Sequence, residues 1–298
     1  MLNTIPVIVL FQISAVILTA FFYTVLSASY SVWLYSVYIF GFSHYFLATF
    51  YSRHKLNALL VSPRHCLALL FLLILGYLNY EYISSITLFF GLHHALSEAY
   101  LRQRIYKFSV DETLLSPIQA TSFIFHLCGF ILLINSSAIS QFDNLTLPAL
   151  LVFIGSGFYF VRLIWQQKPQ LNSTQLLSIT GSELILMLVL LISLLYPITF
   201  LQIVFYHFTF WAIMPFLRLA SGEESNTKPL MIYISLALVS LIFFTAISPI
   251  YVSTFMGKIV FQKWFLIFSY AHITLSFATS IANPAWLNAC FKNKELAV

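Results

Sequence analysis

The feature that most constrains this chain is a long apolar block that recurs along the sequence. Each block runs for roughly 18 to 24 residues, enough for a helix rising ~1.5 Å per residue to cross ~30 Å of hydrocarbon. Hydrophobic residues make up 60% of the 298 positions and charged residues only 8%, too few charges for a water-soluble fold. The blocks lack the alternation of barrel strands. The sequence therefore predicts an all-α, polytopic integral membrane bundle, with residues 1–298 forming a single transmembrane domain.

We expect about ten transmembrane helices in this bundle, given the length of each block. The first run, Ile5 to Val25, has no basic residue before it and is longer than a typical signal-peptide core, so it is expected to be retained. The predicted spans are 5–27, 32–51, 64–81, 84–101, 117–135, 147–165, 179–196, 198–219, 230–250 and 262–286.

Positive charges fall mainly in alternate connections between the predicted helices. Arg53 and Lys55 follow the second helix, Arg102 and Arg104 follow the fourth, and Lys168 follows the sixth. The positive-inside rule then places both termini in the cytoplasm, and the short connections favour a bacterial inner membrane. The net charge of +5 is scattered rather than gathered on one basic face, so no nucleic-acid partner is predicted. Membrane lipid is the expected surrounding, and no oligomeric state is specified.

Histidines carry the main chemical signal. Ionisable residues inside a membrane are costly and usually face a partner in the bundle interior. Four predicted helices that run in the same direction carry an imidazole near or slightly below the midplane, so these side chains can converge on one metal ion. The candidate ligands are His44, His93 or His94, His207 and His272. Imidazole ligands suit Fe, Cu or Zn. His126 is interpreted as a hydrogen bond across a helix pair.

The segment Gly91–Glu98 refines this prediction. His94 and Glu98 are one helical turn apart on one face, so Glu98 can orient an imidazole without binding the metal itself. His93 points about 100° away from His94 on a helix. Only one of the two adjacent histidines is therefore expected to be a ligand, and the spacing does not decide which.

The order of these motifs resembles that of the Brp/Blh family of membrane β-carotene dioxygenases. Ser43-His44 lies on an early helix, Leu92-His93-His94 on a later one, and His207 much further along. The family's first motif is Pro-His-Gly-like, where this chain has Ser-His-Tyr, and its last motif has a second histidine at the position of Trp211. The resemblance implies Fe(II) bound by neutral imidazoles, and oxygenation or oxidative cleavage of a lipid-dissolved substrate such as a carotenoid.

Two other classes of function remain open from the sequence. A haem protein would use two of the histidines as axial ligands for electron transfer. A transporter or structural membrane protein would use the histidines for proton coupling or helix packing and would bind no metal.

Overall fold

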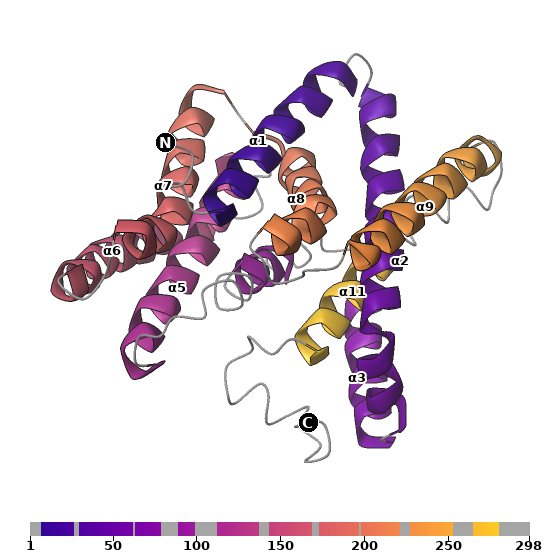
Figure 1. Ribbon diagram of the computed structural model, residues 1–298, viewed down its shortest axis with the longest axis horizontal. Coiled ribbons are helices and arrows are strands. Elements are labelled where there is room, and N and C mark those ends of the chain that lie inside the picture. Colours follow the sequence, from indigo (N-terminus) through magenta and orange to yellow (C-terminus); the bar gives the residue numbers. More distant parts are fainter. Residues whose placement is uncertain are drawn as a thin grey trace. The chain divides into compact units, whose positions relative to one another are not determined.

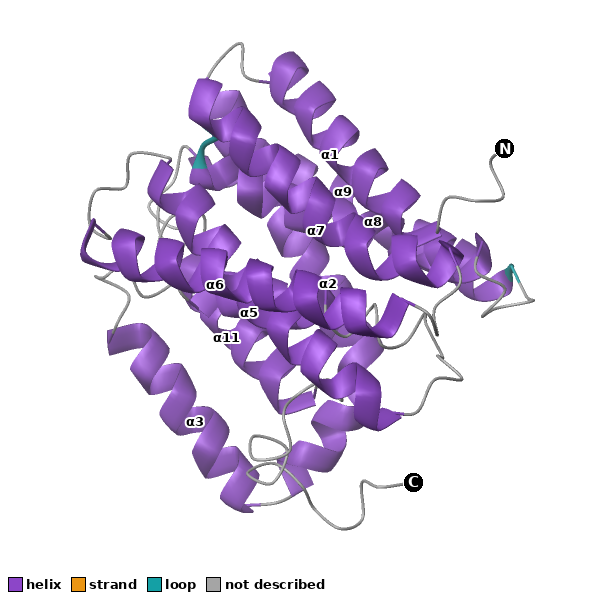
Figure 2. Ribbon diagram, turned by 90° about the vertical axis from the view of Figure 1, so that its left-hand side faces the viewer, coloured by secondary structure: helices purple, strands orange, loops and turns teal. Residues whose placement is uncertain are grey.

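The computed structural model describes residues 7–26, 30–61, 63–78, 89–98, 112–136, 143–168, 173–196, 198–220, 227–252 and 265–279. No strand occurs in these ranges, as the colouring of Figure 2 shows. The all-α prediction is therefore confirmed for the described residues. A helix covers 89–98, and the others are α1 (Val7–Leu26), α2 (Tyr30–Val61), α3 (Pro63–Leu78), α5 (Glu112–Ser136), α6 (Asp143–Gln167), α7 (Ser173–Leu195), α8 (Phe200–Ala220), α9 (Lys228–Val252) and α11 (Phe265–Thr279).

Each predicted span overlaps one of these helices, but the end of α2 was predicted wrongly. We expected a basic loop after residue 51, whereas α2 continues through Arg53 and Lys55 to Val61. Charged residues end an apolar span without ending a helix, because Lys, Arg, Leu and Ala are all good helix formers. His65, near the start of the predicted span 64–81, lies in α3 and is buried.

The described chain forms two compact units, each containing its own helix contacts (Figure 1). Unit 1 comprises Met1–Ser27 and His94–Thr227. In it, α5 packs against α6 and α7, and α1 packs against α7 and α8. Unit 2 comprises Ala28–His93 and Lys228–Val298, in which α2 contacts α3, α9 and α11, and α3 contacts α11. The single transmembrane domain remains a prediction.

Four helices contain segments long and apolar enough to cross a membrane: Ile8–Leu26, Pro117–Ile134, Thr146–Gln167 and Lys228–Ala246. Many of their large apolar side chains are exposed, whereas several polar and ionisable side chains are buried. In water this distribution would leave large apolar patches in contact with solvent. In a bilayer the same apolar side chains face lipid, so the distribution supports membrane association.

The crossing of α1 and α7 depends on a small residue. An ideal Cβ placed on Gly181 would lie 2.4 Å from Cγ2 of Val9, whereas a Cβ on Gly155 in α6 would meet nothing within 4 Å. Small residues let membrane helices approach closely. Gly181 therefore permits the spacing at which α1 and α7 pack.

We predict that Gly181→Leu destabilises the protein by ~1–3 kcal/mol, because the added side chain overlaps Val9 at the α1–α7 crossing. The matched control Gly155→Leu should have little effect. Thermal unfolding of both variants in the same detergent measures the difference. Equal loss of stability in the two variants would contradict the close packing at Gly181.

Candidate functional site

The carboxylate of Glu98 is the centre of a buried polar cluster in unit 1. Gln12 Nε2 of α1 donates to its Oε2 at 3.1 Å, and the Tyr206 hydroxyl of α8 donates to its Oε1 at 3.3 Å. Two imidazoles also face it: His94 Nε2 lies 3.2 Å from Oε1, and His126 Nε2 of α5 lies 3.3 Å from Oε2. Only 3% of Glu98 is exposed. Two hydrogen bonds and two nearby imidazole nitrogens therefore surround a carboxylate that offers about four lone-pair sites.

Gln12 links Glu98 to α7. Its Oε1 accepts a hydrogen bond from Ser182 Oγ at 2.9 Å while its Nε2 donates to Glu98. The two contacts fix the orientation of the amide, because only the oxygen can accept and only the nitrogen can donate. The glutamine therefore bridges an acceptor on one helix and a donor on another.

His126 extends the cluster toward a second buried acid, Glu183 of α7. Its Nδ1 lies 3.2 Å from the Ser122 carbonyl oxygen and 3.9 Å from Glu183 Oε1. Ser122 Oγ also donates to Glu183 Oε1. A carbonyl oxygen has no hydrogen to give, so Nδ1 of His126 must donate. One proton then lies between Nε2 of His126 and Oε2 of Glu98, on either atom.

His94 faces His207 of α8 with its other nitrogen. The two Nδ1 atoms are 2.8 Å apart, and each residue is only 1% exposed. Because Nε2 of His94 faces Glu98, this imidazole has a carboxylate on one side and a second imidazole on the other. The expected contact between His94 and Glu98 is present.

A second pair of histidines lies within unit 2. Nε2 of His44 in α2 and Nε2 of His272 in α11 are 3.1 Å apart. The His93 ring approaches His272 edge-on, with ring centroids 5.2 Å apart. The Tyr45 ring packs against His272, with ring centroids 5.0 Å apart, and its hydroxyl lies 2.6 Å from Ser269 Oγ. Three of the predicted imidazoles therefore gather in unit 2.

The adjacent histidines of the helix over 89–98 have different partners, as their angular separation requires. His93 faces His272 of unit 2, whereas His94 faces His207 of unit 1. His93 and His94 therefore each lie beside another histidine, and the expectation that only one of the two is a metal ligand stays a prediction. Convergence of all four helices on one ion involves both units and stays a prediction.

Both imidazole pairs have a spacing that a metal ion can use. Two ligand atoms with bonds of ~2.1 Å lie ~3.0 Å apart when bound at right angles, as in an octahedral site, and ~3.4 Å apart in a tetrahedral site. The observed separations are 2.8 Å and 3.1 Å, which also suit a hydrogen bond between two rings. In unit 1, Glu98 would hold the nitrogen of His94 that does not face His207, which is the usual arrangement around a metal-bound imidazole. The donors therefore fit an imidazole-bound transition metal.

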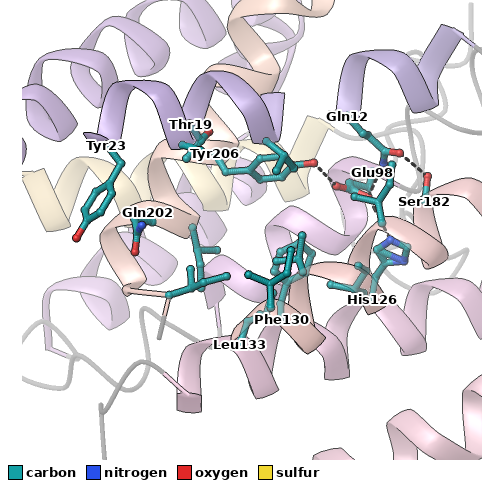
Figure 3. A pocket seen from close by; sticks show the side chains of 18 of the residues that line it. Gln12, Thr19, Tyr23, Glu98, His126, Phe130, Leu133, Ser182, Gln202 and Tyr206 are labelled. Carbon is teal, nitrogen blue, oxygen red and sulfur yellow. Dashed lines mark hydrogen bonds and ion pairs between the residues drawn. The ribbon is translucent and has the colours of Figure 1, made fainter. Parts of the chain in front are cut away.

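An apolar pocket of about 530 Å³ adjoins the Glu98 cluster. It is bounded by α1, α5, α7 and α8, all in unit 1. Figure 3 shows Gln12, Glu98, Ser182 and His126 at one end, and Tyr23 and Gln202 toward the other. Phe130 and Leu133 lie between these ends, and Ile185 and Val189 also line the wall. The volume lies in the range of pockets that hold small molecules.

Sequence reasoning missed several members of this site. His126 was interpreted as a contact across a helix pair, and its Nε2 does lie 3.3 Å from Glu98 of another helix, but its place in this cluster was not predicted. Glu183, buried beside Ser122 and His126, was not predicted as a member of the site. One signal was available: a second carboxylate within an apolar block needs a buried partner. Which helix supplies that partner depends on the tertiary packing.

Comparison with protein-family models, with curated proteins and with solved structures found no match.

We predict that Glu98→Leu destabilises the protein by ~3–5 kcal/mol, because it leaves the Gln12, Tyr206 and histidine groups without their shared acceptor. Glu98→Gln should have a smaller effect, since one oxygen remains. Ser14→Ala is the control, because among the described residues the exposed Ser14 hydroxyl bonds the carbonyl of Leu10 in its own helix. Thermal unfolding in detergent measures all three. If Glu98→Leu is as stable as Ser14→Ala, the carboxylate does not hold the helices together.

Proposed function

We propose that this protein is a membrane-embedded, metal-dependent oxidoreductase that acts on a hydrophobic substrate dissolved in the lipid. The observation that carries the proposal is the pair His94–His207, with Glu98 on the opposite nitrogen of His94 and an apolar pocket beside Glu98. A metal site needs imidazole donors, a group that orients them and space for a substrate, and unit 1 contains all three.

Iron is the metal that we propose, with copper and zinc as alternatives. Neutral imidazoles suit all three metals, and an Fe(II) ion that retains open positions would supply oxygen chemistry. The ligands would come from the predicted set His44, His93, His94, His207 and His272. Glu98 would orient His94 through its Nε2 atom, at the observed 3.2 Å. Aromatic and aliphatic walls would keep water away from the substrate.

The proposed setting is a bundle of about ten transmembrane helices. The four segments that are long and apolar enough to span a bilayer support it, together with the exposed apolar side chains. We further propose that the membrane is a bacterial inner membrane with both termini on the cytoplasmic side, on the basis of the positive-inside rule. A carotenoid-like polyene is the first substrate to test, because the sequence resembles membrane carotenoid dioxygenases.

Metal analysis and an optical spectrum of detergent-purified protein, expressed with added iron, test the proposal before any substrate is known. We expect about one iron per chain and no Soret band, as for a non-haem centre. A Soret band would instead indicate a haem protein. Absence of stoichiometric metal would contradict the proposal and favour a transporter or a structural membrane protein.

Single histidine variants then test the ligand set. His44→Ala and His207→Ala should each remove most of the bound metal, since each deletes one imidazole donor. His65→Ala is the matched control, because His65 in α3 is buried but is outside the proposed ligand set. Metal content at the wild-type level in the first two variants would show that these residues are not ligands.

A further inference from the structure

We propose that the unit 1 pocket binds a neutral, single-chain amphiphile whose hydroxyl or carbonyl oxygen accepts a hydrogen bond from the Gln202 amide, and whose apolar chain extends toward Glu98. The inference deepens the proposed function by naming a smaller class of substrate than a carotenoid-like polyene, and it rests on that function only in taking this ligand to be the substrate. Binding itself requires no metal and can be measured separately.

The start of α8 fixes the orientation of Gln202. Thr199 precedes the helix, and Gln202 Oε1 accepts hydrogen bonds from the Thr199 backbone N–H at 2.7 Å and from its hydroxyl at 2.9 Å. The Gln202 backbone N–H returns a bond to the Thr199 hydroxyl at 3.3 Å. This reciprocal arrangement is a capping box. Since Oε1 is held by Thr199, the two N–H groups of Nε2 are the part of the amide left to bind a ligand.

Gln202 lines the pocket, and its Nε2 has no hydrogen-bond partner among the described residues. A second polar group in the same part of the wall is also unused. Within the described chain, the buried hydroxyl of Thr19 has no partner, although Ser14 and Thr24 on the same helix each bond a carbonyl oxygen at 2.8 Å. Figure 3 places Thr19, Tyr23 and Gln202 toward the same end. A ligand oxygen at this end can satisfy groups that the protein leaves unpaired.

At the other end of the pocket, the described donors are largely occupied by protein acceptors. The Gln12 amide donates to Glu98 and accepts from Ser182, which leaves one of its N–H groups against two for Gln202, and the Tyr206 hydroxyl donates to Glu98. This end therefore has less need of a polar group from the ligand. The polar head is therefore assigned to the Gln202 end, and the apolar chain to the length of wall between Gln202 and Glu98.

This orientation agrees with the direction of a lipid in a bilayer. Gln202 lies in the first turn of α8, and Tyr23 lies near the last residue of α1, so the proposed head is at helix ends. Helix ends of membrane bundles lie near the polar interface. Gln12 and Tyr23 are ~16 Å apart along α1 at ~1.5 Å per residue, which gives the length available to the chain.

Size and charge narrow the class of ligand. A volume of about 530 Å³ holds ~18 non-hydrogen atoms at ~30 Å³ each, fewer than a whole carotenoid contains. No lysine or arginine is among the lining residues that the structure describes. An anionic head would be buried without a counter-charge, which is unfavourable. A hexadecyl chain with an alcohol head matches both properties, and it fits the ~16 Å length in a bent rather than a fully extended conformation.

The test uses full-length protein in nanodiscs and a photoreactive analogue of 1-hexadecanol, with labelled peptides identified by mass spectrometry. We expect labelling of α1, α7 and α8 that excess 1-hexadecanol suppresses. Hexadecanoate should compete at least tenfold less well than the alcohol. Labelling elsewhere, or equal competition by alcohol and acid, would overturn the proposal.

Gln202→Glu isolates the contribution of the amide. Glutamate retains the capping box, because its carboxylate can still accept from Thr199, but it lacks the two N–H donors. We expect competition by the alcohol to weaken about tenfold, equivalent to ~1.4 kcal/mol, and competition by hexadecylamine to strengthen. Unchanged competition by both compounds would show that Gln202 does not contact the head.

Two tryptophan substitutions on α7 test the position of the chain. Val189 lines the pocket, whereas its neighbour Leu188 is 57% exposed and faces away from it. Val189→Trp should abolish specific labelling, and Leu188→Trp should preserve it. Circular dichroism and thermal unfolding check that both variants fold. Metal content is measured in parallel, so that failed binding with intact metal rejects this ligand class without rejecting the proposed metal site.

Discussion

Unit 1 is organised around one shared acceptor, the carboxylate of Glu98. Groups from α1, α5 and α8 reach it, and Gln12 passes the connection on to Ser182 of α7. In hydrocarbon each of these donors would be costly if it had no partner, so satisfying several of them with one carboxylate couples the helices that supply them. Close packing at Gly181 complements this polar contact by bringing α1 next to α7.

The same cluster borders two environments. Glu98 lies 3.2 Å from a nitrogen of His94, whose other nitrogen faces His207. Glu98 also lines an apolar pocket with unused hydrogen-bonding groups at its far end, near Thr199 and Gln202. A lipid-dissolved molecule entering with its polar oxygen at that far end would bring its chain beside Glu98. The proposed metal chemistry and the proposed ligand class therefore both involve Glu98.

The sequence predicted the helices well, because the length of an apolar block is a local property. The prediction that the second helix ends before Arg53 and Lys55 was wrong, because charged residues can end a membrane span while the helix continues, here to Val61. The contact between His94 and Glu98 was predictable from one-turn spacing. By contrast, the contacts of Glu98 with Gln12, His126 and Tyr206 join distant segments, and the role of Gln202 depends on a capping box and on pocket shape. Such contacts are set by tertiary packing, which periodicity does not encode.

The most direct test of the central role of Glu98 is a double-mutant cycle on stability, with Gln12→Leu, Glu98→Leu and the double variant unfolded in the same detergent. Because the first substitution removes the donor that the second would leave unpaired, we predict that the double variant is more stable than the sum of the single effects by ~1–3 kcal/mol. Effects that add to within ~0.5 kcal/mol would show that the two side chains do not interact and would contradict this account.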